Sequence, residues 1–104
     1  MTINSRNKGK VGELELAAVL KEHGFEARRG QQYSGGDTSQ DLIHDIPGVH
    51  IECKRVEAGN LYTWLAQAIR DAAAGKMPVV MHRRNRQEWV AVLRLEDFLK
   101  LVKG

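Results

Sequence analysis

The sequence predicts one α/β (α+β) domain, residues 1–104, with a central mixed sheet flanked by helices. The chain has 104 residues, of which 42% are hydrophobic and 28% charged, which is enough for one modest core and too little for two. Segments with helical periodicity and segments with strand-like alternation follow one another along the chain. Gly and Pro separate these segments, and we find no internal repeat or low-complexity linker.

Local signals define the elements of the first half. Asn4 or Ser5 can cap a first helix, and Gly24 is a typical helix stop. The dipeptide Pro47-Gly48 favours a type II turn between two strands. The expected elements are a helix to about His23, a short strand at 25–29, a loop at 30–40 and strands at 41–45 and 49–55.

The second half continues the alternation. Gly75 and Pro78 end a helix and introduce an apolar strand. We expect a helix at 61–74, strands at 79–82 and 88–93 and a closing helix at 94–101. On the helix at 61–74, the stripe through Tyr62, Leu65 and Ile69 is expected to face the core. The predicted order is αβββαββα, one sheet with helices on its faces.

Charge and cysteine content narrow the function classes. The 16 Lys and Arg exceed the 13 Asp and Glu by three, and the basic residues gather in short clusters suited to a phosphate backbone. The single Cys53 excludes an internal disulfide and fits a reducing cytosol. The sequence argues against a zinc site, because it has no second Cys and no paired His at ligand spacing. Because no apolar run approaches the length of a membrane span and the start is polar, we expect a cytoplasmic protein.

Charged residues interrupt two apolar strands, where they are costly without a partner. If Pro47-Gly48 forms a two-residue hairpin, Asp41 lies opposite Lys54, and Glu52 shares their face because residues two apart on a strand project to the same side. Cys53 then projects to the other face. A one-residue slip would scatter this set. The alternative is structural, since a lone Glu-x-Lys is usually a solvated ion pair.

Glu13 is the unusual acid of the first helix. It lies on the face of Leu16, Ala17 and Leu20, at i+3, i+4 and i+7. A carboxylate on this apolar face needs a cation or hydrogen bonds to offset its burial. Such an acid can also be an ordinary boundary residue.

Carboxylates with a Lys suit phosphodiester hydrolysis. Carboxylate oxygens bind Mg²⁺, with Mn²⁺ as a substitute, and the Cys53 carbonyl could add a backbone ligand. Such a metal acidifies bound water and neutralises charge on the phosphate. Lys54 could orient the water or stabilise the developing charge.

These residues resemble the PD-(D/E)xK nuclease superfamily, and within it archaeal-type Holliday junction resolvases and related phage endonucleases. The likeness lies in the opening helix around Glu13, in Asp41-Leu42-Ile43 and in Ile51-Glu52-Cys53-Lys54. It implies a restriction-endonuclease-like αβββαβ core, here with an extra strand and a C-terminal helix. It also implies Glu13, Asp41 and Glu52 as metal ligands, Lys54 as the catalytic lysine, and a homodimer. Gln40 replaces the Pro of the motif, and Asp37 is a rival for Asp41.

Further residues are candidates for contact with DNA. Basic side chains give affinity for phosphate without sequence information, and the helix after the E-x-K strand often directs a Gln at the site in this superfamily. Trp64 and Trp89 could stack on bases, although core or dimer packing is the favoured interpretation. The candidates are Lys8, Lys10, Arg28, Arg29, Ser34, Asp37, Gln67, Arg83, Arg84 and Arg86.

We therefore expect a Mg²⁺-dependent DNA endonuclease that cuts branched DNA, as a Holliday junction resolvase does. One alternative is a nuclease of the same chemistry acting on flap, nicked or duplex DNA. The other is a non-catalytic DNA-binding protein with the same fold. The preference for branches follows from the family resemblance alone.

Overall fold

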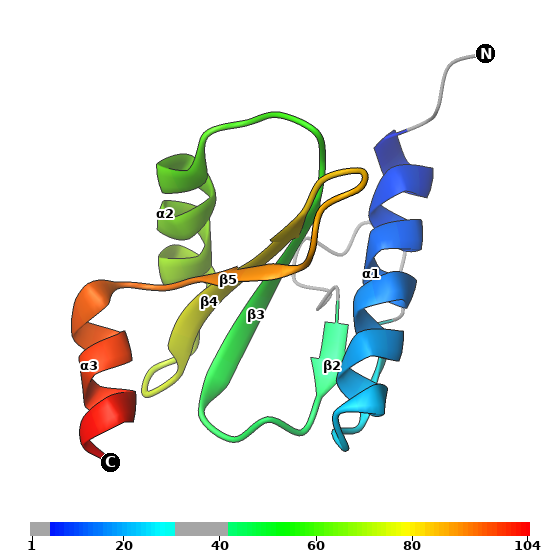
Figure 1. Cartoon of the computed structure of the whole chain (residues 1–104). Helices are drawn as coiled ribbons and strands as arrows, with labels where there is room; N and C mark the ends of the chain where they lie inside the picture. The colour runs from blue at the N-terminus through cyan, green and yellow to red at the C-terminus, as the bar shows by residue number, and fades with distance from the viewer. Residues whose placement is uncertain (1–4, 31–41) are drawn as a thin grey trace. The chain divides into compact units, whose positions relative to one another are not determined.

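The computed structural model describes residues 5–30 and 42–104, with side chains from residue 9 onward, and divides into two compact units at Pro47. Lys8, whose side chain is not described, and Ser34, Asp37 and Asp41 therefore lie outside the described side chains. The element order is αβββαββα, as predicted, and Figure 1 labels its helices and strands. No described helix combines the length and apolarity needed to cross a membrane.

The first unit combines one helix and two short strands, α1 (Ser5–Glu22), β1 (Ala27–Arg29) and β2 (Leu42–His44). α1 ends as expected, because Gly24 takes a φ of 92° and the Phe25 N–H donates to the Leu20 carbonyl at 3.0 Å. β1 and β2 pair antiparallel, with Arg28 opposite Ile43. The core of this unit consists of Leu16, Ala17, Leu20, Ala27 and Leu42.

The second unit is a βαββα arrangement. It contains β3 (Val49–Arg55), α2 (Leu61–Asp71), β4 (Met77–Arg83), β5 (Val90–Val92) and α3 (Leu95–Lys103). β3 and β4 pair in parallel, and β5 pairs antiparallel with β4, so the sheet is mixed. α2 is the crossover between the parallel strands and packs alongside the sheet (Figure 1). Pro78 lies in β4 at the end that β5 does not pair with, so its missing N–H costs no bond to β5.

The predicted hairpin between strands 41–45 and 49–55 is wrong in its pairing. The turn at Pro47-Gly48 forms, with a φ of 71° at Gly48, but β2 pairs with β1 and β3 pairs with β4. A type II turn matches the twist of a two-residue hairpin poorly. The register that placed Asp41 opposite Lys54 has no support in the described strands.

The expected core stripe of α2 is also wrong. Tyr62 is 79% exposed and Ile69 40% exposed, whereas Ala68 is fully buried and Trp64 partly buried. α2 begins at Asn60, whose side chain accepts from the N–H groups of residues 62 and 63, and it ends at Asp71 rather than at 74. The rotation of the helix therefore directs Trp64 toward the sheet.

α3 presents most of its apolar side chains to solvent. Its one buried residue is Asp97, which accepts a hydrogen bond from Arg94 Nε at 2.9 Å. The exposed apolar side chains are Leu95, Phe98, Leu99, Leu101 and Val102. Contiguous apolar surface of this kind is typical of an interaction site.

Candidate active site

The E-x-K residues lie on one face of β3. Side chains two apart along a strand share a face, and Glu52 Oε1 lies 3.9 Å from Lys54 Nζ. The Glu52 residue is 6% exposed, and the Lys54 side chain is 23% exposed. A carboxylate buried to this degree needs cationic neighbours, so this face of β3 holds a charged pair that the fold maintains next to its core.

α2 brings Gln67 to this pair. Lys54 Nζ donates to Gln67 Oε1 at 3.2 Å, and the fully buried Ala68 and Val80 lie in the core between α2 and the sheet. The predicted candidate Gln67 is therefore in contact with Lys54. Its neutral amide oxygen orients the ammonium group without adding a further negative charge beside that of Glu52.

His50 is a residue of this face that sequence reasoning missed. Its Nε2 lies 3.7 Å from Glu52 Oε2, beyond hydrogen-bond distance, and is buried without a hydrogen-bond partner among the described residues. The side chain is 23% exposed. The available signal was the period of two, which places residues 50, 52 and 54 on one side of β3.

Glu13 occupies the predicted apolar face of α1 in the first unit. The residue is 7% exposed and lies among Leu16, Ala17 and Leu20. Arg29 Nε donates to Glu13 Oε1 at 2.9 Å, so the burial of the carboxylate is offset by a charge-assisted hydrogen bond. Arg29, a candidate for contact with DNA, is thus engaged inside its own unit, whereas Lys10 and Arg28 are exposed.

The donor atoms suit a hard divalent cation. Glu13, Glu52 and the Cys53 carbonyl all offer oxygen, the ligand that Mg²⁺ and Mn²⁺ prefer. Among residues 5–30 and 42–104, no group of three or more His, Cys, Asp or Glu side chains is gathered closely enough to hold a metal ion. Asp41, the remaining expected ligand, lies outside the described residues.

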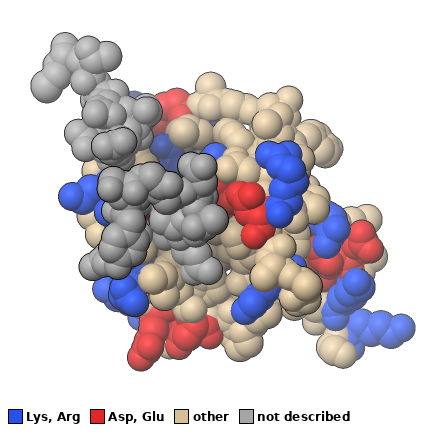
Figure 2. Space-filling view, turned by 180° about the vertical axis from the view of Figure 1, so that it is seen from behind, with Lys and Arg blue, Asp and Glu red and all other residues tan. Residues whose placement is uncertain are grey.

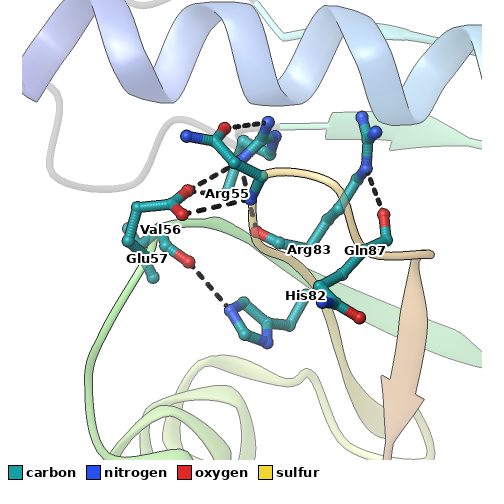
Figure 3. A network of polar contacts seen from close by, with 7 residues as sticks. Arg55, Val56, Glu57, His82, Arg83 and Gln87 are labelled. Carbon is teal, nitrogen blue, oxygen red and sulfur yellow. Dashed lines mark hydrogen bonds and ion pairs between the residues drawn. The ribbon is translucent and has the colours of Figure 1, made fainter.

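Polar contacts order the basic turn between β4 and β5. The two Glu57 oxygens accept from the Asn85 N–H at 3.0 and 3.1 Å, and Arg55 Nη2 donates to Asn85 Oδ1 at 2.8 Å (Figure 3). Arg83 Nε donates to the Gln87 carbonyl at 2.6 Å. The turn is therefore held by β3 and by the segment after it.

The charges elsewhere are mixed. Figure 2 shows both Lys and Arg side chains and Asp and Glu side chains among the residues that it colours. Arg84 and Arg86 are exposed on the ordered turn. Contact with a phosphate backbone would therefore depend on individually placed basic side chains more than on the overall charge.

Comparison with known proteins found a matching family model and similar solved structures. The profile of the family described as "Phage putative PDDEXK endonuclease" matches residues 4–103. A solved structure of Archaeoglobus fulgidus Hjc, a Holliday junction resolvase from an archaeal hyperthermophile, superposes with a TM-score of 0.55 at 20% identity, covering 78% of this chain and 72% of that chain. No curated protein sequence matched. The structural match confirms the predicted nuclease-type α+β fold.

Proposed function

Because the chain belongs to the family of phage PDDEXK endonucleases, we propose that it hydrolyses DNA phosphodiester bonds with Mg²⁺, for which Mn²⁺ can substitute. The observation that carries the proposal is the Glu52, Lys54 and Gln67 constellation on β3 and α2. A purely structural ion pair would not require a neutral amide that orients the lysine of the pair. We propose that residues 1–104 act as a single nuclease domain.

We assign roles from the motif and from the described contacts. Glu13, Asp41 and Glu52, with the Cys53 carbonyl, would hold the divalent ion. When bound, that ion supplies Lewis-acid activation of water and charge neutralisation at the phosphate. Lys54 donates hydrogen bonds to a non-bridging phosphate oxygen and stabilises the charge that grows as the water oxygen attacks phosphorus.

Gln67 is a positioning residue. Its hydrogen bond at 3.2 Å restricts the flexible Lys54 side chain, and a pre-oriented donor loses less entropy when the phosphate arrives. As the water oxygen bonds to phosphorus, the water releases a proton to solvent. The bond between phosphorus and the leaving sugar oxygen breaks, and a proton from solvent restores that hydroxyl group.

We further propose that the substrate is branched DNA and that the enzyme acts as a homodimer in the cytoplasm. The structural similarity to a Holliday junction resolvase supports the substrate class. The exposed apolar side chains of α3 support a dimer, because a second copy would bury them. The basic turn at residues 83–86 would contact the DNA backbone.

The test is cleavage of a labelled four-way junction beside a linear duplex of matched sequence, with Mg²⁺ or with EDTA. The wild type, Glu52→Ala and the matched control Glu22→Ala, which removes an exposed acid of α1, are compared. We expect Mg²⁺-dependent cuts at the junction that Glu52→Ala abolishes and Glu22→Ala retains.

Other outcomes separate the alternatives. Equal cutting of the duplex would retain the chemistry and reject the preference for branches. Binding without cutting, in Mn²⁺ as well, would reject the nuclease proposal in favour of a non-catalytic DNA-binding protein.

A further inference from the structure

A cavity of about 430 Å³ lies beside the candidate active site within the second unit. Residues from the segment 57–64 and from the segment 82–90 line it, and we name it the Trp64 cavity. Its volume falls in the range of about 300–1,000 Å³ that is usual for ligand sites. Neither Glu52 nor Lys54 lines it, so the cavity is distinct from the constellation described above.

The cavity is nevertheless adjacent to the lysine. His82, in its wall, is the register partner of Lys54 across β3 and β4, and paired strands lie about 4.8 Å apart. Trp64, which also lines the cavity, precedes Gln67 by three residues on α2, so both lie on the same side of the helix. A group in the cavity would therefore lie next to a phosphate held by Lys54.

The indole of Trp64 is fixed before any ligand arrives. Its ring lies 4.7 Å from the His82 imidazole, tilted by 49°, and His82 Nε2 lies 3.0 Å from the Val56 carbonyl oxygen. At Gly59 a Cβ would come within 2.3 Å of Trp64 Cζ2, and the φ there is 152°, so the backbone approaches the ring as only glycine allows. A rigid aromatic wall binds a flat ligand at a low entropic cost.

The walls combine apolar and basic surface. Leu61 and Val90 add apolar contacts to the indole, and both are partly exposed to solvent, at 38% and 50%. Arg84 and Arg86 line the cavity from the ordered turn. Of the two acids in the lining, Glu57 is engaged by Arg55 and by the Asn85 N–H, and Glu88 is exposed.

An aromatic and apolar wall beside arginines matches the chemistry of one nucleotide, whose base stacks and whose phosphate pairs with guanidinium groups. We propose that the Trp64 cavity binds one unstacked nucleotide of the substrate strand, beside the phosphate that is cut. This inference rests on the proposed nuclease function and deepens it. It gives the preference for branches a physical cause, because a base at a branch costs less to unstack than a base inside a duplex.

The test is an abasic scan of the cleaved strand. Each nucleotide near the cut is replaced in turn by an abasic residue, and the affinity of the protein for the four-way junction is measured in EDTA by fluorescence anisotropy. We expect one position at which loss of the base weakens binding at least about fivefold, the lower limit for a base stacked on an aromatic ring.

Two variants at the start of α2 localise the effect. Leu61→Glu places a negative charge in the cavity, and Thr63→Glu places the same charge on the same helical turn at an exposed residue outside the lining. Both add an acid to a helix start that has none, which favours folding of the helix. We expect Leu61→Glu to lose the position-specific sensitivity and Thr63→Glu to retain it.

The same preparations are assayed for Mg²⁺-dependent cleavage, which separates the two proposals. A scan that is flat within about twofold, from an enzyme that cuts the junction, would reject the cavity and leave the nuclease intact. A sensitive position that Leu61→Glu retains would also reject it. Absence of both binding and cleavage in the wild type would reject the nuclease function and this inference with it.

Discussion

The conformation of Arg86 allows a strong test of the basic turn. The turn at 84–87 is closed by the Gln87 N–H, which donates to the Arg84 carbonyl at 3.2 Å, and Arg86 occupies its third position with a φ of 63°. Gly is the usual residue there. A side chain in this left-handed region costs about 1–2 kcal/mol, so the turn retains a strained arginine where a glycine would fit.

We compare Arg86→Gly with Arg86→Ala, which both remove the charge but differ in strain. Glycine relieves the strain, but it also raises the conformational entropy of the unfolded chain, which offsets part of the gain. The net result should make Arg86→Gly more stable than Arg86→Ala by about 0.5–1 kcal/mol. For a domain of this size the difference corresponds to roughly 2–8 °C in Tm. Thermal unfolding followed by circular dichroism measures it.

Both variants should weaken DNA binding equally. If Arg86 contacts one phosphate, the slope of log K against log[salt] becomes shallower by about 0.9 for each variant, and the same holds for Arg84→Ala. Equal melting temperatures for the Gly and Ala variants would refute the argument from strain. An unchanged salt slope would refute the contact with phosphate.

The remaining predictions use the other contacts. Gln67→Ala should lower the single-turnover cleavage rate about 10- to 100-fold through loss of a hydrogen bond to a charged group, and Gln67→Glu, which keeps an acceptor but adds a negative charge beside Lys54, should not restore the rate; an unchanged rate in Gln67→Ala would contradict the positioning role. Phe98→Asp should shift the sedimenting species from dimer to monomer without unfolding the chain. The double variant Glu13→Ala/Glu52→Ala should cleave DNA no more slowly than either single variant if both acids serve one metal site. Additive losses in the cleavage rate would show that the two acids act independently. Asn60→Ala should cost about 1 kcal/mol of stability in chemical denaturation through loss of the α2 cap, and Asn60→Asp should not.

Local signals in the sequence were sufficient for the elements but not for their partners. Ser5, Gly24 and the Pro47-Gly48 turn act within a few residues, and the predicted strand 49–55 matches β3 in both its ends. The pairing of β3 with β4 joins segments separated by α2, and no local pattern specifies such a partner. The pairing of β3 with β4 was therefore outside what local signals could predict.

The candidate site was predictable in the same uneven way. The helical period placed Glu13 on the buried face of α1, and the strand period placed Glu52 and Lys54 together. The cation that offsets the burial of Glu13, Arg29, belongs to a different element. Partner choice of this kind depends on three-dimensional packing, so the sequence could indicate that a cation was needed without identifying it.

On α2, the hydrophobic pattern did not predict which side of the helix faces the sheet. Its most apolar stripe is exposed, and the side facing the sheet carries Trp64, Gln67 and Ala68, a mixture that helical periodicity alone ranks low. Each of these side chains has a specific neighbour there. Trp64 contacts His82, Gln67 accepts a hydrogen bond from Lys54, and Ala68 packs into the apolar core. Departures from local sequence rules are expected at functional sites. One short helix, capped by Asn60, thereby contacts Lys54 through Gln67 and supplies Trp64 to the wall of the Trp64 cavity, so the proposed lysine role and the proposed nucleotide site both depend on the position of this helix.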